Sequence, residues 1–105
     1  MSSVNSISFY QRFVKDINSG KKTITIRDIK ANNYTVGQSV QALTHENNQA
    51  FAQLKIINIQ PILFEDINDK HAKQENMRLL ELKDVIREIY PDVFELYVLE
   101  FRLID

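Results

Sequence analysis

Two residue types that can act together as nucleophile and base lie in one short segment, Gly20–Arg27, with the sequence Gly-Lys-Lys-Thr-Ile-Thr-Ile-Arg. A threonine hydroxyl reacts at neutral pH only when a base removes its proton, and a lysine can be that base once its pKa falls. Burial and nearby positive charge both lower a lysine pKa. Lys21, Lys22 and Arg27 supply several cations near Thr25, so a partly neutral amine is expected here. Attack by Thr25 with Lys22 as base is therefore one chemistry open to this segment.

The same segment alternates polar and apolar residues, which predicts a half-buried strand. Ile24 and Ile26 would face the core, while Thr25 and Arg27 would share the opposite face. Strict alternation places residues 22 and 25 on opposite faces, so Lys22 must lie in the turn before regular pairing begins if it is to reach Thr25. The alternative is an ordinary edge strand with a solvated face and a surface lysine.

A third candidate is Glu75, which lies in a polar link ahead of a predicted helix at residues 79–89. One interpretation is an ordinary carboxylate that the positive end of the helix dipole favours. The other is an acid–base group in a loop that faces a cleft. The local sequence leaves both open. We expect His71, which lies nearby, to be a surface or packing residue.

Composition excludes several classes of protein and of site. The chain of 105 residues has 44% hydrophobic and 26% charged residues, values typical of one globular domain, which we assign to residues 1–105. A net charge of −1 argues against a protein whose main role is to grip long nucleic acids. The chain has no cysteine, and its two histidines, His45 and His71, lack metal-ligand spacing. There is no glycine-rich phosphate loop and no G-x-S-x-G motif. We expect no metal and no cofactor.

The chain shows no signal peptide and no apolar run long enough to span a membrane. We therefore expect a cytoplasmic protein that makes no membrane contact.

Apolar periodicity predicts the elements that must position the candidate residues. Phe9, Phe13 and Ile17 recur every four residues, which predicts a helix over Ile7–Ser19 with Gly20 directly after its end. A later helix would be capped by Asn76 and ended by Pro91. The remaining predicted elements are strands at residues 39–44, 51–59 and 94–103, a loop at 28–35, a hairpin turn at 45–48, a short helical turn at 65–72 and a polar link at 73–77.

These elements predict the α+β fold class, with five to six strands and two to three flanking helices. Short connections between sequential strands favour an antiparallel or mixed sheet that curls into a small barrel. The last strand has apolar residues on both faces and is expected to be central. Pro61 is expected to place the end of the long third strand at an edge or a bend.

Five segments also match a known group of proteins in their residues, most specifically Lys-Thr-Ile-Thr-Ile-Arg and Lys-His-Ala-x-Gln-Glu-Asn-Met. They are Phe9–Phe13, Gly20–Asp28, Lys70–Met77, Ile89–Pro91 and Tyr97–Phe101. With these segments the chain resembles the small bacterial ASCH-domain proteins that act as N(4)-acetylcytidine amidohydrolases. The resemblance runs over nearly the whole chain, and between residues 29 and 63 it rests mostly on length. It implies a PUA-like β-barrel with flanking helices.

The resemblance further implies hydrolysis of the acetyl amide of N(4)-acetylcytidine to cytidine and acetate. The family's catalytic residues fall on Lys22 as proton acceptor, Thr25 as nucleophile and Glu75 as proton donor, and all three residue types are intact here. An acetyl-threonine intermediate would form and be cleared by water, with direct attack of a Lys22-activated water as the alternative. We expect Arg27, on the same strand face as Thr25, to bind the substrate carbonyl or the oxyanion.

Two other functions stay open at this stage. PUA-like domains are often RNA readers, so the alternative to the amidohydrolase is an RNA-binding or ribonucleolytic module. A partner-binding domain with an inactive cleft is a third possibility. The sequence also leaves open whether the partner is a small-molecule nucleoside or RNA that contains acetylated cytidine.

Overall fold

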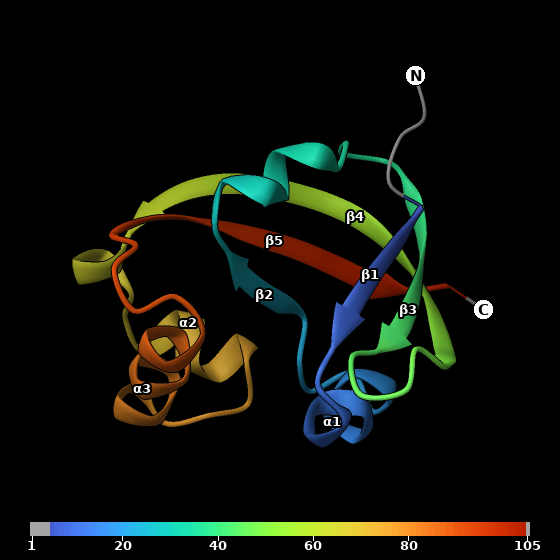
Figure 1. Ribbon diagram of the computed structural model, residues 1–105, viewed down its shortest axis with the longest axis horizontal. Coiled ribbons are helices and arrows are strands. Elements are labelled where there is room, and N and C mark those ends of the chain that lie inside the picture. Colours follow the sequence, from blue (N-terminus) through green and yellow to red (C-terminus); the bar gives the residue numbers. More distant parts are fainter. Residues whose placement is uncertain (1–4, 105) are drawn as a thin grey trace.

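Five strands form one mixed sheet within residues 5–104, the part of the chain that the computed structural model describes (Figure 1). The sheet order is β1-β3-β4-β5-β2. β1 and β3 are parallel, and the other neighbours are antiparallel. The strands are β1 (Ser6–Phe9), β2 (Ile24–Arg27), β3 (Ser39–Thr44), β4 (Ala50–Leu63) and β5 (Glu95–Leu103). The α+β class, the mixed sheet and the central position of the last strand are confirmed.

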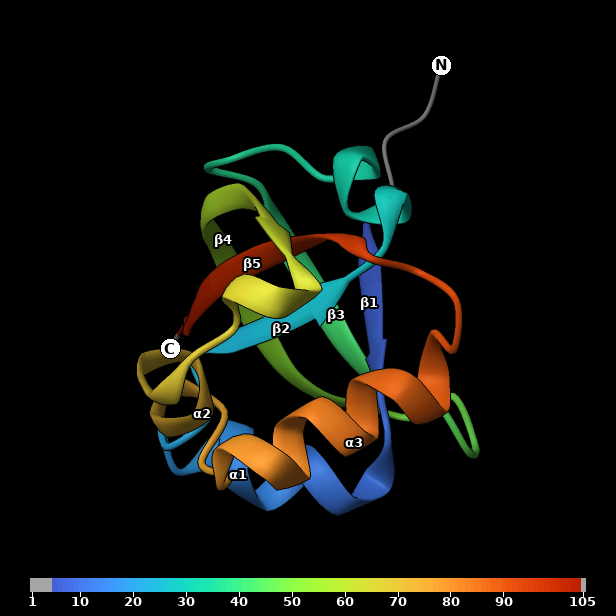
Figure 2. The same ribbon diagram turned by 90° about the vertical axis from the view of Figure 1, so that its left-hand side faces the viewer.

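The two edge strands of this sheet, β1 and β2, approach one another through side chains and share no backbone ladder among the described residues. Arg27 of β2 donates from Nη2 to the Ser8 carbonyl of β1 at 2.6 Å. The Tyr34 hydroxyl donates to the Ser6 carbonyl at 2.7 Å. The sheet is therefore strongly curled and barrel-like, and its open seam lies between β1 and β2, as the turned view shows (Figure 2).

The three described α-helices lie on one side of the curved sheet (Figure 1). They are α1 (Val14–Asn18), α2 (Asp69–Gln74) and α3 (Leu79–Ile89), with 3-10 turns at η1 (Gln11–Phe13), η2 (Ile29–Asn33) and η3 (Phe64–Asp66). None of these helices is long and apolar enough to cross a bilayer.

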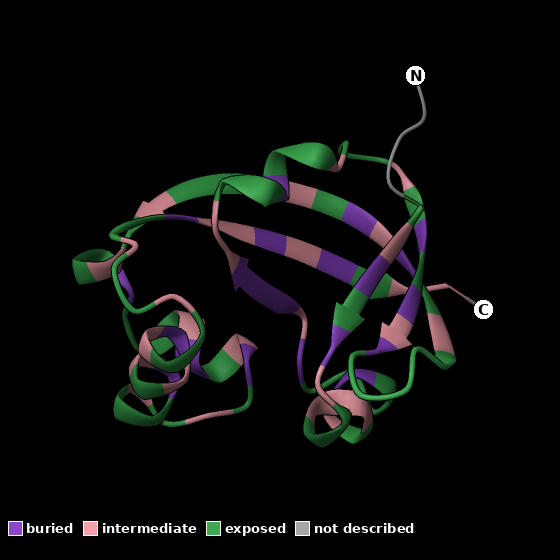
Figure 3. Cartoon of the chain, in the orientation of Figure 1, coloured by how far each residue is buried: buried purple, intermediate pink, exposed green. Residues whose placement is uncertain are grey.

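The apolar core has two parts, and β5 contributes to both (Figure 3). Leu99 and Phe101 pack between the strands with residues of β1, β3 and β4. Leu96 packs with Ile24 and Ile26 of β2 against α3, whose Leu82 and Ile86 are buried. Each fully buried aliphatic side chain of this kind contributes about 1.5–3 kcal/mol to folding. Both isoleucines of β2 thus anchor the strand, as its alternation predicts.

The predicted helix over Ile7–Ser19 is wrong in its first half. Residues 6–9 form β1, in which Ile7 and Phe9 point into the core and alternate with more exposed neighbours. Phe9 fits a period of two with Ile7 and a period of four with Phe13, so periodicity alone joined strand and helix into one element. The predicted helix end is confirmed: α1 ends at Asn18, and Gly20 follows with a φ of +79°.

Three smaller predictions also need correction. The predicted loop at 28–35 contains the 3-10 turn η2, which Asp28 caps by accepting from the Lys30 N–H. The N-cap of α3 is Arg78, because the predicted cap Asn76 instead has a φ of +58° and ends α2. The predicted strand at 51–59 is longer at both ends, since β4 begins at Ala50 and continues through Pro61 to Leu63. There it pairs with β5 alone among the described strands, which agrees with the expected edge position for proline.

Candidate active site

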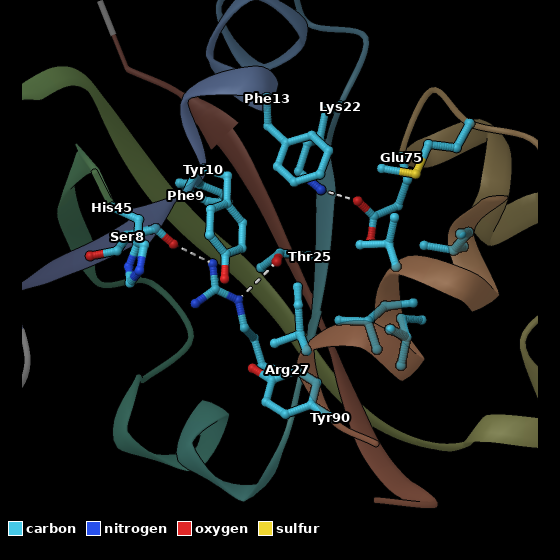
Figure 4. Close-up of a pocket in the computed structure, with 16 residues that line it drawn as sticks. Ser8, Phe9, Tyr10, Phe13, Lys22, Thr25, Arg27, His45, Glu75 and Tyr90 are labelled. Atoms are coloured by element: carbon cyan, nitrogen blue, oxygen red, sulfur yellow. Dashed lines mark hydrogen bonds and ion pairs between the residues drawn. The ribbon is translucent and has the colours of Figure 1, made fainter. Parts of the chain in front are cut away.

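A cavity of about 220 Å³ opens at the seam between β1 and β2 and is closed on its far side by α3 (Figure 4). One wall is polar and the other is apolar. Its lining residues are Ser8, Phe9, Tyr10 and Phe13; Lys22, Thr25, Ile26 and Arg27; His45; Glu75 and Met77; and Leu82, Val85, Ile86, Ile89 and Tyr90. All four predicted site residues, Lys22, Thr25, Arg27 and Glu75, line this one cavity.

Lys22 occupies the turn before β2, where the strand prediction required it to be. Its side chain is only 3% exposed. The amine donates a hydrogen bond to the Ile24 carbonyl at 2.9 Å and forms an ion pair with Glu75. It also lies over the ring of Phe13, with 5.0 Å from Nζ to the ring centroid. The lysine is therefore a buried, held group, and the solvated surface lysine of the alternative interpretation is ruled out.

Burial and charge together tune this amine. Burial, and to a lesser extent the nearby Arg27 guanidinium, lower the pKa of Lys22 from 10.5 to about 7, against the opposing effect of the Asp16 carboxylate. At neutral pH a substantial fraction of the amine can thus lack its extra proton. This is the property that a lysine general base needs.

Glu75 reaches the amine because the end of α2 lies beside the entrance to β2. Glu75 is the C-terminal cap of α2 and is 4% exposed. The preceding Gln74 accepts from the Thr23 N–H at 2.8 Å, which fixes the two backbones side by side. Figure 4 shows the carboxylate and the Lys22 amine pointing at one another. Of the two interpretations of Glu75, the first-turn helix carboxylate is excluded.

Thr25 is held by the other cation of the site. Arg27 donates from Nε to Thr25 Oγ1 at 2.9 Å and from Nη2 to the Ser8 carbonyl, so its guanidinium is fixed at the seam. Thr25 is 6% exposed and lies on the cavity face of β2, as its strand parity predicts. Because Thr25 Oγ1 is the acceptor in this bond, its own proton is available to another group. Burial lowers the pKa of Arg27.

Lys22 and Thr25 share the cavity, but the described residues include no hydrogen bond between them. The amine is paired with Glu75, and the hydroxyl is paired with Arg27. The two side chains therefore line a common cavity, as expected, but do not contact one another through a hydrogen bond. Proton transfer between them requires movement of a side chain or an intervening water.

An aromatic wall at the same mouth is a feature that the sequence did not single out. Tyr10 and His45 meet edge to face, with 4.9 Å between ring centroids, and the His45 N–H donates to the Phe9 carbonyl at 2.8 Å. Arg12 lies over the Tyr10 ring. Nothing local in the sequence links Tyr10 to His45, because only the parallel pairing of β1 with β3 brings them together. His71, by contrast, accepts from the Asn68 N–H and caps α2, in keeping with the structural role expected for it.

The described residues contain no cluster of three or more metal-ligating side chains. The chemistry that this site offers is that of a hydroxyl, an amine, a carboxylate and a guanidinium around one small cavity with an apolar wall.

Comparison with known proteins shows the family of the chain. The sequence model of the ASCH domain matches residues 5–104. The chain belongs to the ASCH-domain family. Its curated relatives include the N(4)-acetylcytidine amidohydrolases of Vibrio atlanticus (49% identical, covering 99% of this chain and 100% of that protein) and Vibrio vulnificus strain YJ016 (46% identical, covering 97% and 98%).

Among solved structures, the fold of this ASCH-domain protein is similar to that of the ASCH domain from Lactobacillus crispatus. The TM-score is 0.79 at 10% identity, over 94% of this chain and 79% of the other. This likeness concerns the fold alone, and it agrees with the curled mixed sheet and flanking helices described above.

Proposed function

We propose that this ASCH-domain protein hydrolyses the acetyl amide of N(4)-acetylcytidine to give cytidine and acetate. The observation that carries the proposal is the cavity that holds Lys22, Thr25, Arg27 and Glu75 together, three of them almost fully buried. The names of the two Vibrio relatives, nearly half identical over the full length, supply the substrate. No metal or cofactor is needed, because each step below uses these side chains and water.

Thr25 is the proposed nucleophile. Neutral Lys22 takes the proton of Thr25 Oγ1, and the oxygen forms a bond to the acetyl carbonyl carbon. The Arg27 Nε–H, already on Oγ1 at 2.9 Å, stabilises the negative charge that develops on this oxygen before the bond forms. The carbonyl oxygen becomes the oxyanion of the tetrahedral intermediate, and the same guanidinium is a cation that can stabilise it.

The Lys22–Glu75 hydrogen bond offers both catalysts in their required forms at once. A protonated amine beside a carboxylate contains the same number of protons as a neutral amine beside a carboxylic acid. Transfer of one proton across this bond therefore converts the ion pair into a general base and a general acid without exchange with solvent. Burial favours this neutral form relative to water, because desolvation destabilises charges.

Glu75 then completes the first half of the reaction. As the C–N bond breaks, its proton passes to the departing cytosine, which leaves as a neutral base, and the acetyl group stays on Thr25. Protonation of the ring nitrogen beside the amide would serve this end through the imino tautomer. In the second half Lys22 first returns its proton to Glu75 across their hydrogen bond. Neutral again, Lys22 takes a proton from water, whose oxygen attacks the ester carbonyl carbon, and it passes this proton to Thr25 Oγ1 as the ester bond breaks, so that acetic acid leaves as acetate and a proton.

The aromatic wall of Tyr10 and His45 is a place for the cytosine ring to pack, at the mouth of the cavity opposite α3. A net charge of −1 fits a small nucleoside better than a long RNA, which requires a surplus of cations. We therefore propose the nucleoside as substrate class. RNA that contains acetylated cytidine is the other outcome of the test.

We further propose a single ASCH domain over residues 1–105 and a cytoplasmic location. The domain match over residues 5–104 supports one ASCH domain over residues 1–105. A cytoplasmic location is open to a fractionation experiment.

The decisive assay incubates the protein with N(4)-acetylcytidine and follows cytidine release by chromatography, with Lys22→Ala, Thr25→Ala and Glu75→Gln in parallel. We expect release by the wild type and loss in each variant. If the wild type releases no cytidine, or if the three variants match it, the proposal fails. Rapid quench and intact-mass analysis should reveal an acetyl adduct on Thr25. Its repeated absence would favour direct attack by water that Lys22 activates.

A further inference from the structure

Three consecutive residues at the end of α2 each bond to α1 or to the segment that joins α1 to β2. The central bond is the catalytic pair itself, and a bond lies on either side of it. The three bonds are Thr23 N to Gln74 O (2.8 Å), Lys22 Nζ to Glu75 Oε1, and Asn76 Nδ2 to Asp16 Oδ1 (3.1 Å).

Asp16 contacts both halves of this junction. Its main-chain carbonyl accepts from the N–H groups of Lys21 and Lys22, both at 3.0 Å, so the end of α1 holds the backbone from which the catalytic lysine extends. Its carboxylate reaches across to Asn76, 60 residues away in the chain. One residue thus ties the backbone of the proposed base to the segment of the proposed acid.

Asn76 fixes the other half. It follows Glu75 directly and has a φ of +58°, a left-handed conformation that ends α2 and sets the direction of the chain at the carboxylate. Asn48, in the hairpin turn between β3 and β4, is the only other described residue besides glycine with a positive φ, at 57°. The two asparagines share a backbone conformation, but only Asn76 reaches toward the catalytic pair.

We propose that Asp16 and Asn76 are positioning residues that hold the Lys22 amine against the Glu75 carboxylate. The consequence for catalysis rests on the proposed function. The consequence for the geometry of the pair does not.

The charge of Asp16 also affects the pKa of Lys22. The charged groups that face the Lys22 amine are Glu75 from the end of α2, Arg27 from β2 and Asp16 from α1. The Asp16 carboxylate raises the pKa of Lys22, against burial and Arg27. Asp16→Asn keeps an oxygen that can accept from Asn76 but removes the charge, so it should lower this pKa while it preserves the bond.

The positioning role is tested by Asn76→Gly, with Asn48→Gly as the matched control. Glycine adopts positive φ freely, so both changes relieve the same backbone conformation, and only Asn76→Gly removes the bond to Asp16. We expect Asn76→Gly to lower kcat for N(4)-acetylcytidine by about tenfold or more, with KM changed less than about twofold, because small misplacements of catalytic groups are costly. Asn48→Gly should match the wild type.

A double-mutant cycle shows whether the two residues act through one another. Asp16→Ala and Asn76→Gly should each reduce kcat, and the double variant should be little worse than the more affected single one. Asp16→Asn should retain most of kcat but move the acid limb of kcat/KM to lower pH. Fully additive losses in the cycle would contradict the proposed bond.

A measurement without turnover separates this proposal from the proposed function. Heteronuclear NMR of the Lys22 side chain reports its environment and its titration in each variant. We expect the Lys22 Nζ signals to shift in Asn76→Gly and to titrate at lower pH in Asp16→Asn. Identical signals and titration in Asn76→Gly, Asp16→Asn and Asn48→Gly would overturn the positioning role. If these signals move as expected but the wild type releases no cytidine, the proposed function fails and the positioning role stands.

Discussion

The Lys22 amine is paired with the Glu75 carboxylate across 53 residues of chain, and both side chains are nearly withdrawn from solvent. A buried ion pair is seldom the most stable way to fill such a space, because desolvation of two charges offsets their attraction. The cavity beside the pair is walled by apolar residues of α3, which would accept apolar neighbours equally well. The pair is thus better explained by chemistry than by folding.

Replacing both members by apolar residues should therefore stabilise the protein. We expect Lys22→Met combined with Glu75→Leu to raise the free energy of unfolding by about 1–4 kcal/mol and to abolish activity. Lys22→Met alone should lower it, because Glu75 is then left buried without its partner. Urea unfolding monitored by circular dichroism measures both. A double variant less stable than either single variant would contradict the expectation.

The pH dependence of catalysis follows from the lowered pKa of Lys22. Because the base must be unprotonated, kcat/KM should rise with pH through the Lys22 pKa of about 7 and fall again at higher pH, where the pair no longer holds the proton that the leaving group needs. Arg27 lowers this pKa, so Arg27→Gln should move the acid limb to higher pH, beyond any loss in rate. A pH–rate profile from pH 5 to 9 tests both. An acid limb that stays in place in Arg27→Gln would exclude Lys22 as the titrating base.

The same group should leave a signature in stability. In the unfolded chain Lys22 titrates near 10.5 and in the folded protein near 7, so between these values the unfolded state binds one more proton. The free energy of unfolding should then rise with pH above about 7, by at most about 1.4 kcal/mol per unit. Below pH 7 Lys22 is protonated in both states, so it adds no pH dependence to the free energy of unfolding. Urea unfolding at pH 6, 7, 8 and 9 should show a flatter dependence for Lys22→Met than for the wild type.

The sequence determines the local parts of this site more clearly than its assembly. The alternation around Thr25 correctly predicts that Ile24 and Ile26 are buried in the core and that Thr25 and Arg27 lie together at the candidate site. Phe9 shows the limit, because it fits a strand with Ile7 and a helix with Phe13, and pairing with β3 decides between them.

The partners of the proposed catalytic groups depend on tertiary contacts. The residues around Glu75 indicate only a polar carboxylate near a helix. Nothing nearby in the sequence encodes the bond from Thr23 to Gln74 that brings Glu75 to Lys22. Family resemblance linked these residues where physical reasoning on the sequence could not. Neither the resemblance nor the local sequence predicted the contact between Tyr10 and His45.

Substitutions at Thr25 should distinguish the role of its hydroxyl group from that of its branched shape. Thr25→Ser keeps the hydroxyl and the acceptor for Arg27, so it should retain measurable activity. Thr25→Val keeps the branched shape but has no hydroxyl, and it should lose about 10³-fold or more in kcat/KM. Initial rates of cytidine release measure both, with thermal unfolding as a check that Thr25→Val is folded. A Thr25→Val variant as active as Thr25→Ser would show that water attacks the acetyl group directly.

Salt dependence should distinguish the nucleoside from long RNA as substrate. A protein that binds RNA through phosphate contacts loses affinity steeply as salt rises, because released counterions drive the binding. The net charge of −1 and a cavity of about 220 Å³ are suited to one uncharged nucleoside. We expect kcat/KM for N(4)-acetylcytidine to change less than about twofold between about 50 and 200 mM salt. An acetylated RNA oligonucleotide that is hydrolysed faster than the nucleoside at low salt, with a steep loss as salt rises, would instead identify RNA as the substrate.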